Sequence, residues 1–204
     1  MRRRWIVALL ALASLASCVP SINPLYTDKD LVVDPALVGT WIDNDNETWT
    51  FATGTDKSYS LVIDHDGKSG PFVAHLVALG GYRFLDIMPT DGALNQSGLL
   101  EMYRAMYIRT HMFLKVSQVT PTLKMAFLDA DWLKKLLTKS PAALRHERRE
   151  SDDDSVVTAS TAELQAFMIR YGNTADAWGS SNEFKRKAAR RHVGRLRDAG
   201  TTID

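Results

Sequence analysis

The chain has 204 residues, of which 45% are hydrophobic, a formal net charge of +1, and five Trp, six Tyr and seven Phe. This composition excludes a disordered chain, and the length suits one domain with its own apolar core. The single cysteine excludes an internal disulfide framework, so the fold depends on its core rather than on cross-links.

Residues 1–17 have the three parts of an export signal. Three arginines at residues 2–4 form a basic start, and residues 5–13 form an apolar run that is too short for a dependable membrane span. Small residues follow, and the ending Leu-Ala-Ser-Cys at residues 15–18 resembles the lipobox of bacterial lipoproteins. An ordinary cleaved signal or an N-terminal anchor, with a spare thiol at Cys18, is the alternative interpretation.

The lipobox resemblance implies a lipid attachment site. In that family the peptide is cut before the cysteine, which then carries acyl chains, and Cys18 occupies that position. Val19 follows it, whereas an Asp there would resemble an inner-membrane retention signal. We therefore expect a bacterial envelope protein held in the membrane through acylated Cys18, at the periplasmic face of the outer membrane.

Charge is distributed unevenly along the chain. Without the signal at residues 1–17, 187 residues remain with 22 basic and 24 acidic side chains, a net charge of −2. Residues 18–181 have a net charge of −6, from 15 basic and 21 acidic side chains, and residues 182–204 have a net charge of +4, from seven and three. This asymmetry affects which charged partners the protein can meet.

We divide the mature chain into three segments. Residues 18–35 form a proline-containing tether, residues 36–172 form a β domain with packed helices, and residues 173–204 form a basic helical tail.

Residues 36–128 are predicted to form β structure. Apolar and polar residues alternate with a period of two, most clearly over residues 58–64, and turn-forming residues separate the segments. Gly80 and Gly81 suit a two-residue hairpin that needs positive φ, and the strands beside them are apolar on both faces, as in a covered sheet. The short turns favour an antiparallel meander of seven or eight strands, interrupted by a short helix over residues 97–105. The expected strands cover residues 38–42, 48–51, 58–64, 72–79, 82–88, 108–116 and 122–128.

The C-terminal third is predicted to be mainly helical. Asp129 caps a helix over residues 130–138, and Ser160 with Glu163 forms a capping box that opens a second helix. The second helix has a single apolar stripe and ends near Gly172. A polar loop at residues 150–155 and a short strand at residues 156–158 precede this helix. A basic helix at residues 183–197 follows it.

Gly39-Thr40-Trp41 looks like the Gly-x-Trp motif that begins the first strand of lipocalins and related small barrels. The predicted meander extends this resemblance over roughly residues 36–128. In that family the tryptophan closes one end of the barrel, and the opposite mouth admits an apolar ligand. The resemblance implies a mainly β (α+β) fold, a lipocalin-like antiparallel barrel or curved sheet with C-terminal helices, in which Gly39 and Trp41 have structural roles at the barrel end.

Other residues with metal-binding or catalytic chemistry lack a recognised pattern. His65 lies between two aspartates, and His75 and His111 fall within predicted strands, but their spacing fits no known metal motif. The aspartates at residues 152–154 lack an EF-hand pattern and are typical of a solvated loop. The chain has no nucleophile elbow, zinc-protease motif or phosphate-binding loop, so we predict no metal, no cofactor and no enzymatic activity.

The sequence is compatible with two functions. One is a membrane-anchored lipoprotein that binds a small apolar ligand in its barrel. The other is a non-catalytic envelope component that binds a macromolecular or anionic envelope partner through its outer face or its tail. Residues 182–204 are interpreted first as a solvated helix and second as a contact for anionic lipid or cell wall, while an exported location argues against nucleic acid.

Overall fold

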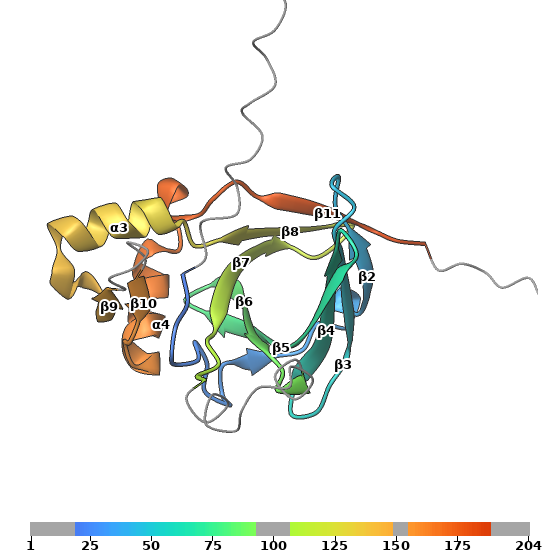
Figure 1. The fold of residues 1–204 in the computed structure, drawn as a ribbon, viewed down its shortest axis with the longest axis horizontal. Helices are drawn as coiled ribbons and strands as arrows, with labels where there is room; N and C mark the ends of the chain where they lie inside the picture. Colours follow the sequence, from blue (N-terminus) through green and yellow to red (C-terminus); the bar gives the residue numbers. More distant parts are fainter. Residues whose placement is uncertain (1–18, 93–106, 149–154, 189–204) are drawn as a thin grey trace, which may run out of the picture.

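The computed structural model describes residues 19–92, 107–148 and 155–188, and these residues form a mainly β protein (Figure 1). Eight strands, β2 to β8 and β11, make a closed antiparallel barrel, and β1 adds to one side of β5. The strands are β1 (Leu31–Val32), β2 (Gly39–Ile42), β3 (Thr48–Thr53), β4 (Ser58–His65), β5 (Lys68–Leu79), β6 (Tyr82–Pro89), β7 (Met112–Gln118), β8 (Thr122–Phe127), β9 (His146–Arg148), β10 (Ser155–Val157) and β11 (Asn182–Arg186).

The barrel is a meander in which each strand from β2 to β8 pairs with the next. Gly80 and Gly81 join β5 to β6 with φ values of 56° and 83°, which suit a tight hairpin turn and confirm the predicted one. The fold class predicted from the alternation and the Gly-x-Trp motif, a lipocalin-like antiparallel barrel with C-terminal helices, is therefore confirmed.

The strand that closes the barrel lies where a basic helix was predicted. Figure 1 shows β11 between β8 and β2, and it pairs with both. Phe184 is buried between the exposed Glu183 and Lys185, so the segment has strand periodicity. The prediction of a helix from Glu183 is wrong for the described residues, because the unpaired edges of β2 and β8 supply hydrogen bonds that outweigh a weak helical stripe. The sheet therefore extends past the domain end predicted at residue 172, and residues 189–197 of the predicted helix lie outside the described residues.

Alternate residues of each strand face opposite sides of the barrel wall. One set packs into the barrel interior; on β5 to β8 the other set packs under the helices, so both faces of β5 and β6 are covered, as predicted. The interior set comprises the buried residues Leu37, Trp41, Trp49, Phe51, Tyr59, Leu61, Ala74, Leu76, Leu85, Ile87, Leu114, Val116, Val119, Leu123, Met125 and Phe184.

A second layer covers the outer face of β5 to β8. It consists of α3 (Ala130–Lys139), α4 (Thr161–Tyr171) and the β9–β10 hairpin, which lie together on one side of the barrel in Figure 1. Asp129 caps α3 by accepting a hydrogen bond from the Trp132 amide at 2.7 Å, and the predicted capping box opens α4. Neither helix is long and apolar enough to cross a membrane, and the same holds for every helix in the described ranges. The helix predicted over residues 97–105 and most of the loop over 150–155 lie outside those ranges.

Residues 19–34, which we name the strap, follow the outer wall of the barrel. The strap runs between α4 and the wall, as the blue segment in Figure 1 shows, and it ends where the 3-10 helix η1 (Pro35–Leu37) leads into β2. Val19 and Leu25 are buried in the outer core, and β1 pairs with β5. The segment predicted as a proline-containing tether, residues 18–35, therefore lies on the wall from residue 19 onward, because its apolar side chains and the backbone groups beside them find partners there.

Candidate functional site

One end of the barrel is closed around Trp41. This side chain is fully buried, and its indole Nε1 donates to the Leu37 carbonyl of η1 at 2.8 Å. Arg186 at the end of β11 lies 4.3 Å from the Trp41 ring and donates to the Val38 carbonyl at 2.8 Å and to the Ala36 carbonyl. Strand β11, η1 and β2 are thereby joined at one point, which seals this end.

Glycine is favoured at position 39 of that seal by its backbone conformation and by the lack of space for a side chain. Its φ of +133° disfavours any residue with a side chain, and a Cβ atom there would collide with the Arg186 guanidinium. The Gly-x-Trp motif therefore has a physical basis in this chain: the glycine leaves room for the arginine, and the tryptophan fills the space beneath it.

The barrel interior is filled by large side chains. The inward-facing aromatic residues of β3 and β11 are 1–2% exposed, and the rings of Trp49 and Phe184 lie 5.6 Å apart. Phe51 packs edge-to-face against Tyr59, with ring centroids 6.1 Å apart. Eight strands enclose a space that side chains alone can fill, and these residues pack as a core rather than as the lining of an open cavity.

The opposite end of the barrel is less completely covered. Ile63 near the end of β4, Phe72 of β5 and Met112 at the start of β7 pack against the interior cluster but remain partly exposed. Glu47 accepts a hydrogen bond from the Trp49 indole at 2.5 Å. Among the described residues, this end therefore offers a partly exposed apolar rim.

The outer wall contains a buried polar cluster under the strap. Ser21, Asp86 and His111 are the buried polar or charged residues of the described chain. His75 of β5 is the direct cross-strand partner of Asp86 on β6, and His111 lies just before β7 on the same face. The ring Nδ1 of His111 lies 2.7 Å from Asp86 Oδ1, and the Leu25 amide donates to Asp86 Oδ2 at 2.8 Å. An ionised carboxylate only accepts, so Nδ1 of His111 is the donor to it.

A serine, a histidine and an aspartate that are buried together invite comparison with a catalytic triad. In a triad the serine hydroxyl bonds to the histidine ring and faces the substrate. Here the Ser21 hydroxyl donates to the Asn23 carbonyl at 2.9 Å, and Ser21 meets His111 through two backbone hydrogen bonds of 2.9 and 2.8 Å. Ser21 is also fully buried, so the three residues fasten the strap instead of forming an accessible nucleophile.

His75 and Tyr26 form the third contact between the wall and the strap. Their rings lie 4.3 Å apart. Burial lowers the pKa of His75; nearby Asp86 opposes this shift and His111 reinforces it. Burial raises the pKa of the Tyr26 hydroxyl, and Asp86 and Asp28 add to that effect. Both side chains are therefore more stable in their neutral forms while the strap is in place.

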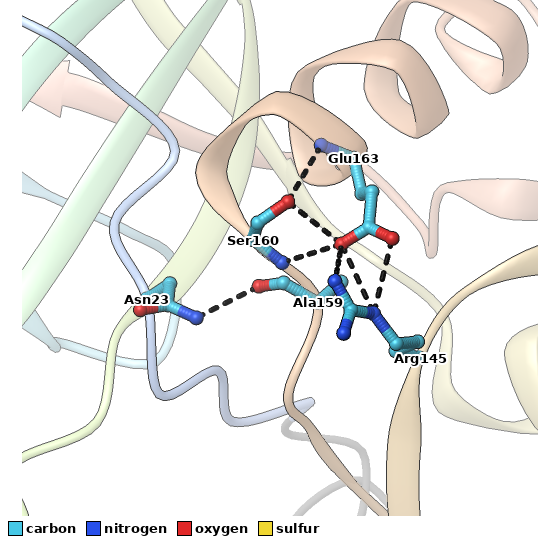
Figure 2. A network of polar contacts seen from close by, with 5 residues as sticks. All are labelled: Asn23, Arg145, Ala159, Ser160 and Glu163. Atoms are coloured by element: carbon cyan, nitrogen blue, oxygen red, sulfur yellow. Dashed lines mark hydrogen bonds and ion pairs between the residues drawn. The ribbon is translucent and has the colours of Figure 1, made fainter.

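A second polar network ties the strap to α4 (Figure 2). The Arg145 guanidinium binds the Glu163 carboxylate with a shortest distance of 2.7 Å, and Ser160 caps the helix beside it. Hydrogen bonds from Arg145 and Ser160 lower the pKa of Glu163 to about 2. Asn23 of the strap donates to the Ala159 carbonyl at 2.9 Å, so the strap is attached to the start of the same helix.

The remaining predicted sites do not assemble into a larger centre. His65 is exposed, with ring nitrogens 3.7 Å from Glu47 and 3.4 Å from Asp66, and no group of three potential metal ligands occurs in the described ranges. Cys18 and the aspartates at 152–154 lie outside those ranges. Sequence reasoning missed Asp86, although a lone carboxylate in a strand that is apolar on both faces is a usable signal of a buried polar contact.

Comparison with known proteins found no matching family model, no matching curated protein and no matching solved structure.

Proposed function

We propose that this protein is a lipid-anchored, non-catalytic component of a bacterial envelope that acts through its outer surface. The observation that supports this proposal best is the filled barrel, whose inward-facing core leaves its exterior for recognition. Surface residues and the basic residues after β11 would then meet a macromolecular or anionic envelope partner.

The anchor in this proposal is Cys18, supported by its position at the end of a signal-like segment. Several acyl chains, at about 0.8 kcal/mol per buried methylene, hold a protein far more firmly than one chain does. We expect Cys18→Ser to abolish incorporation of a labelled fatty acid, while Ser17→Ala, which keeps a small residue before the cysteine, retains it. Equal labelling of the Cys18→Ser variant and the wild type would contradict the anchor and the outer-membrane location proposed with it.

The basic C-terminal residues can be tested separately from the barrel. Because β11 belongs to the sheet, truncation after Ala188 removes basic residues while leaving every described strand intact. Sedimentation of the unacylated protein with anionic liposomes or cell wall over a salt series should show binding that weakens with salt and is lost on truncation. Identical binding by the two proteins would assign the contact to another part of the surface.

A small apolar ligand is the second candidate, favoured by the partly exposed rim of Ile63, Phe72 and Met112. Native mass spectrometry of the protein released from detergent separates the two functions. A co-purifying apolar molecule that is lost in a Phe72→Asp variant would support ligand binding at the rim. A mass equal to that of the acylated chain alone would support the surface-acting component.

A further inference from the structure

Three titratable residues of the barrel wall each contact a different residue of the strap, His111 through its backbone and Asp86 and His75 through their side chains. His111 pairs with Ser21 through backbone hydrogen bonds, Asp86 accepts from the Leu25 amide, and His75 stacks on Tyr26. The three side chains also contact or influence one another, since His111 is bonded to Asp86 and Asp86 faces His75 across the β5–β6 pair. A change of charge at His75 or Asp86 therefore acts directly on the side chains that hold Tyr26 and Leu25 of the strap.

We propose that residues 19–26 are a pH-sensitive part of the strap, held on the barrel at neutral pH by His111, Asp86 and His75 and released under mildly acidic conditions. Residues 27–34 stay in place as the hinge, because β1 pairs with β5 and Asp34 forms an ion pair with Arg83 at 3.1 Å.

The direction of the effect follows from His75. The titratable groups that face it are Tyr26 of the strap, Asp86 of β6 and His111 before β7, and Asp28 acts on Tyr26 in turn. With the strap docked, burial lowers the pKa of His75 below its ordinary value of 6.5; with the strap released, the ring regains solvent and its pKa rises toward that value. Release therefore takes up a proton, so docking is fully favoured above about pH 6.5 and weakens as the pH falls below it.

The described interior of the barrel and its Trp41 seal lack this sensitivity. The interior core consists of apolar side chains and the neutral Tyr59, and the Trp41 seal is made by an arginine that stays charged at all relevant pH values. Acidification should consequently free residues 19–26 without opening the barrel.

Release would change the distance between the barrel and the membrane, a consequence that rests on the proposed anchor at Cys18. Val19 is docked, so the barrel is held close to the anchored cysteine at neutral pH. Eight freed residues, when extended, add roughly 26–29 Å of reach. Release of residues 19–26 would therefore lengthen the connection between the barrel and the membrane anchor.

Hydrogen exchange of the full chain in micelles of an uncharged detergent tests the release. The measured amide exchange rates are corrected for the intrinsic effect of pH on exchange. Between about pH 7.5 and 5.5 we expect the opening constant of residues 19–26 to rise by up to about tenfold per pH unit, the limit for uptake of one proton. Peptides from β2 to β4 should remain protected. Unchanged protection of residues 19–26, or equal loss of protection throughout the barrel, would overturn the proposal.

Matched variants identify the group that responds. His75→Phe keeps a ring against Tyr26 but takes no proton, so its strap should stay protected at both pH values, whereas His65→Gln at the exposed end of β4 should respond as the wild type does. A wild-type response in His75→Phe would overturn the assignment.

An NMR titration of the wild-type protein covers the case in which His75→Phe fails to fold. The His75 ring and the Leu25 amide should then titrate together, and independent titration would contradict the proposal. The measurement needs no acyl chain, so Cys18→Ser should show the same strap response. The fatty-acid labelling described above alone decides the anchor.

Discussion

The inner face of the barrel wall and the part of the outer face that lies under the second layer, over β5 to β8, are both buried but are built from different interactions. The inner face is a continuous apolar core that includes Trp41, Trp49 and Phe184, and its packing depends little on pH. The outer face also has an apolar core, but Asp86, His111 and His75 interrupt it beneath the strap. The inner face therefore accounts for much of the stability of the fold, while the outer face contains the groups whose charge can change its conformation.

The largest expected effect comes from removing the side chain that seals the inner face. Trp41→Ala should reduce the free energy of unfolding by about 3–5 kcal/mol, because it deletes a fully buried aromatic ring and leaves a cavity under Arg186. Denaturant unfolding measures this loss. Val33→Ala, at a half-exposed position of the strap, serves as the control and should change stability by less than about 0.5 kcal/mol. A midpoint for Trp41→Ala equal to that of the control would contradict a sealed inner core.

An intermediate effect is expected from the polar cluster on the outer face. Asp86→Ala leaves the buried His111 ring and the Leu25 amide without their acceptor, which should cost about 1–3 kcal/mol. The loss should be local, so limited proteolysis should cut within residues 19–26 faster than in the wild type. Asp45→Ala, in the exposed β2–β3 turn, is the matched control. Wild-type resistance of the strap in Asp86→Ala would show that the outer cluster does not hold it.

The smallest effect is expected at the exposed network that supports α4. The pKa of Glu163 is lowered to about 2 by Arg145 and Ser160, so its contribution is present above about pH 4.5 and is lost as the pH falls toward 2. Glu163→Gln should therefore be less stable than the wild type near neutral pH, and the difference should shrink between pH 4.5 and 2. Thermal melts over this range measure it, with Glu147→Gln on β9 as the control. A difference that does not depend on pH would mean that the charge of Glu163 is irrelevant.

Much of the fold was predictable because its signals are local. The alternation over residues 58–64 reflects a wall with one face in the core, and Gly80-Gly81 specifies its hairpin through positive φ. The caps at Asp129 and Ser160 act within one turn of their helices. Such features depend on neighbours within a few residues, so the order of strands β2 to β8, the two helices α3 and α4 and the antiparallel class followed from them.

The long-range contacts could not be predicted in the same way. Asn182–Arg186 becomes a strand because the edges of β2 and β8 are free to pair with it, and the segment alone shows only a basic, weakly amphipathic pattern. The strap is ordered because Leu25 and Tyr26 meet Asp86 and His75, residues that lie about 50 or more positions away in the chain. Local sequence sets which backbone shapes are accessible, whereas the closed barrel determines which buried groups face one another, and at Asp86 the charge needs a partner that only the assembled wall and strap supply.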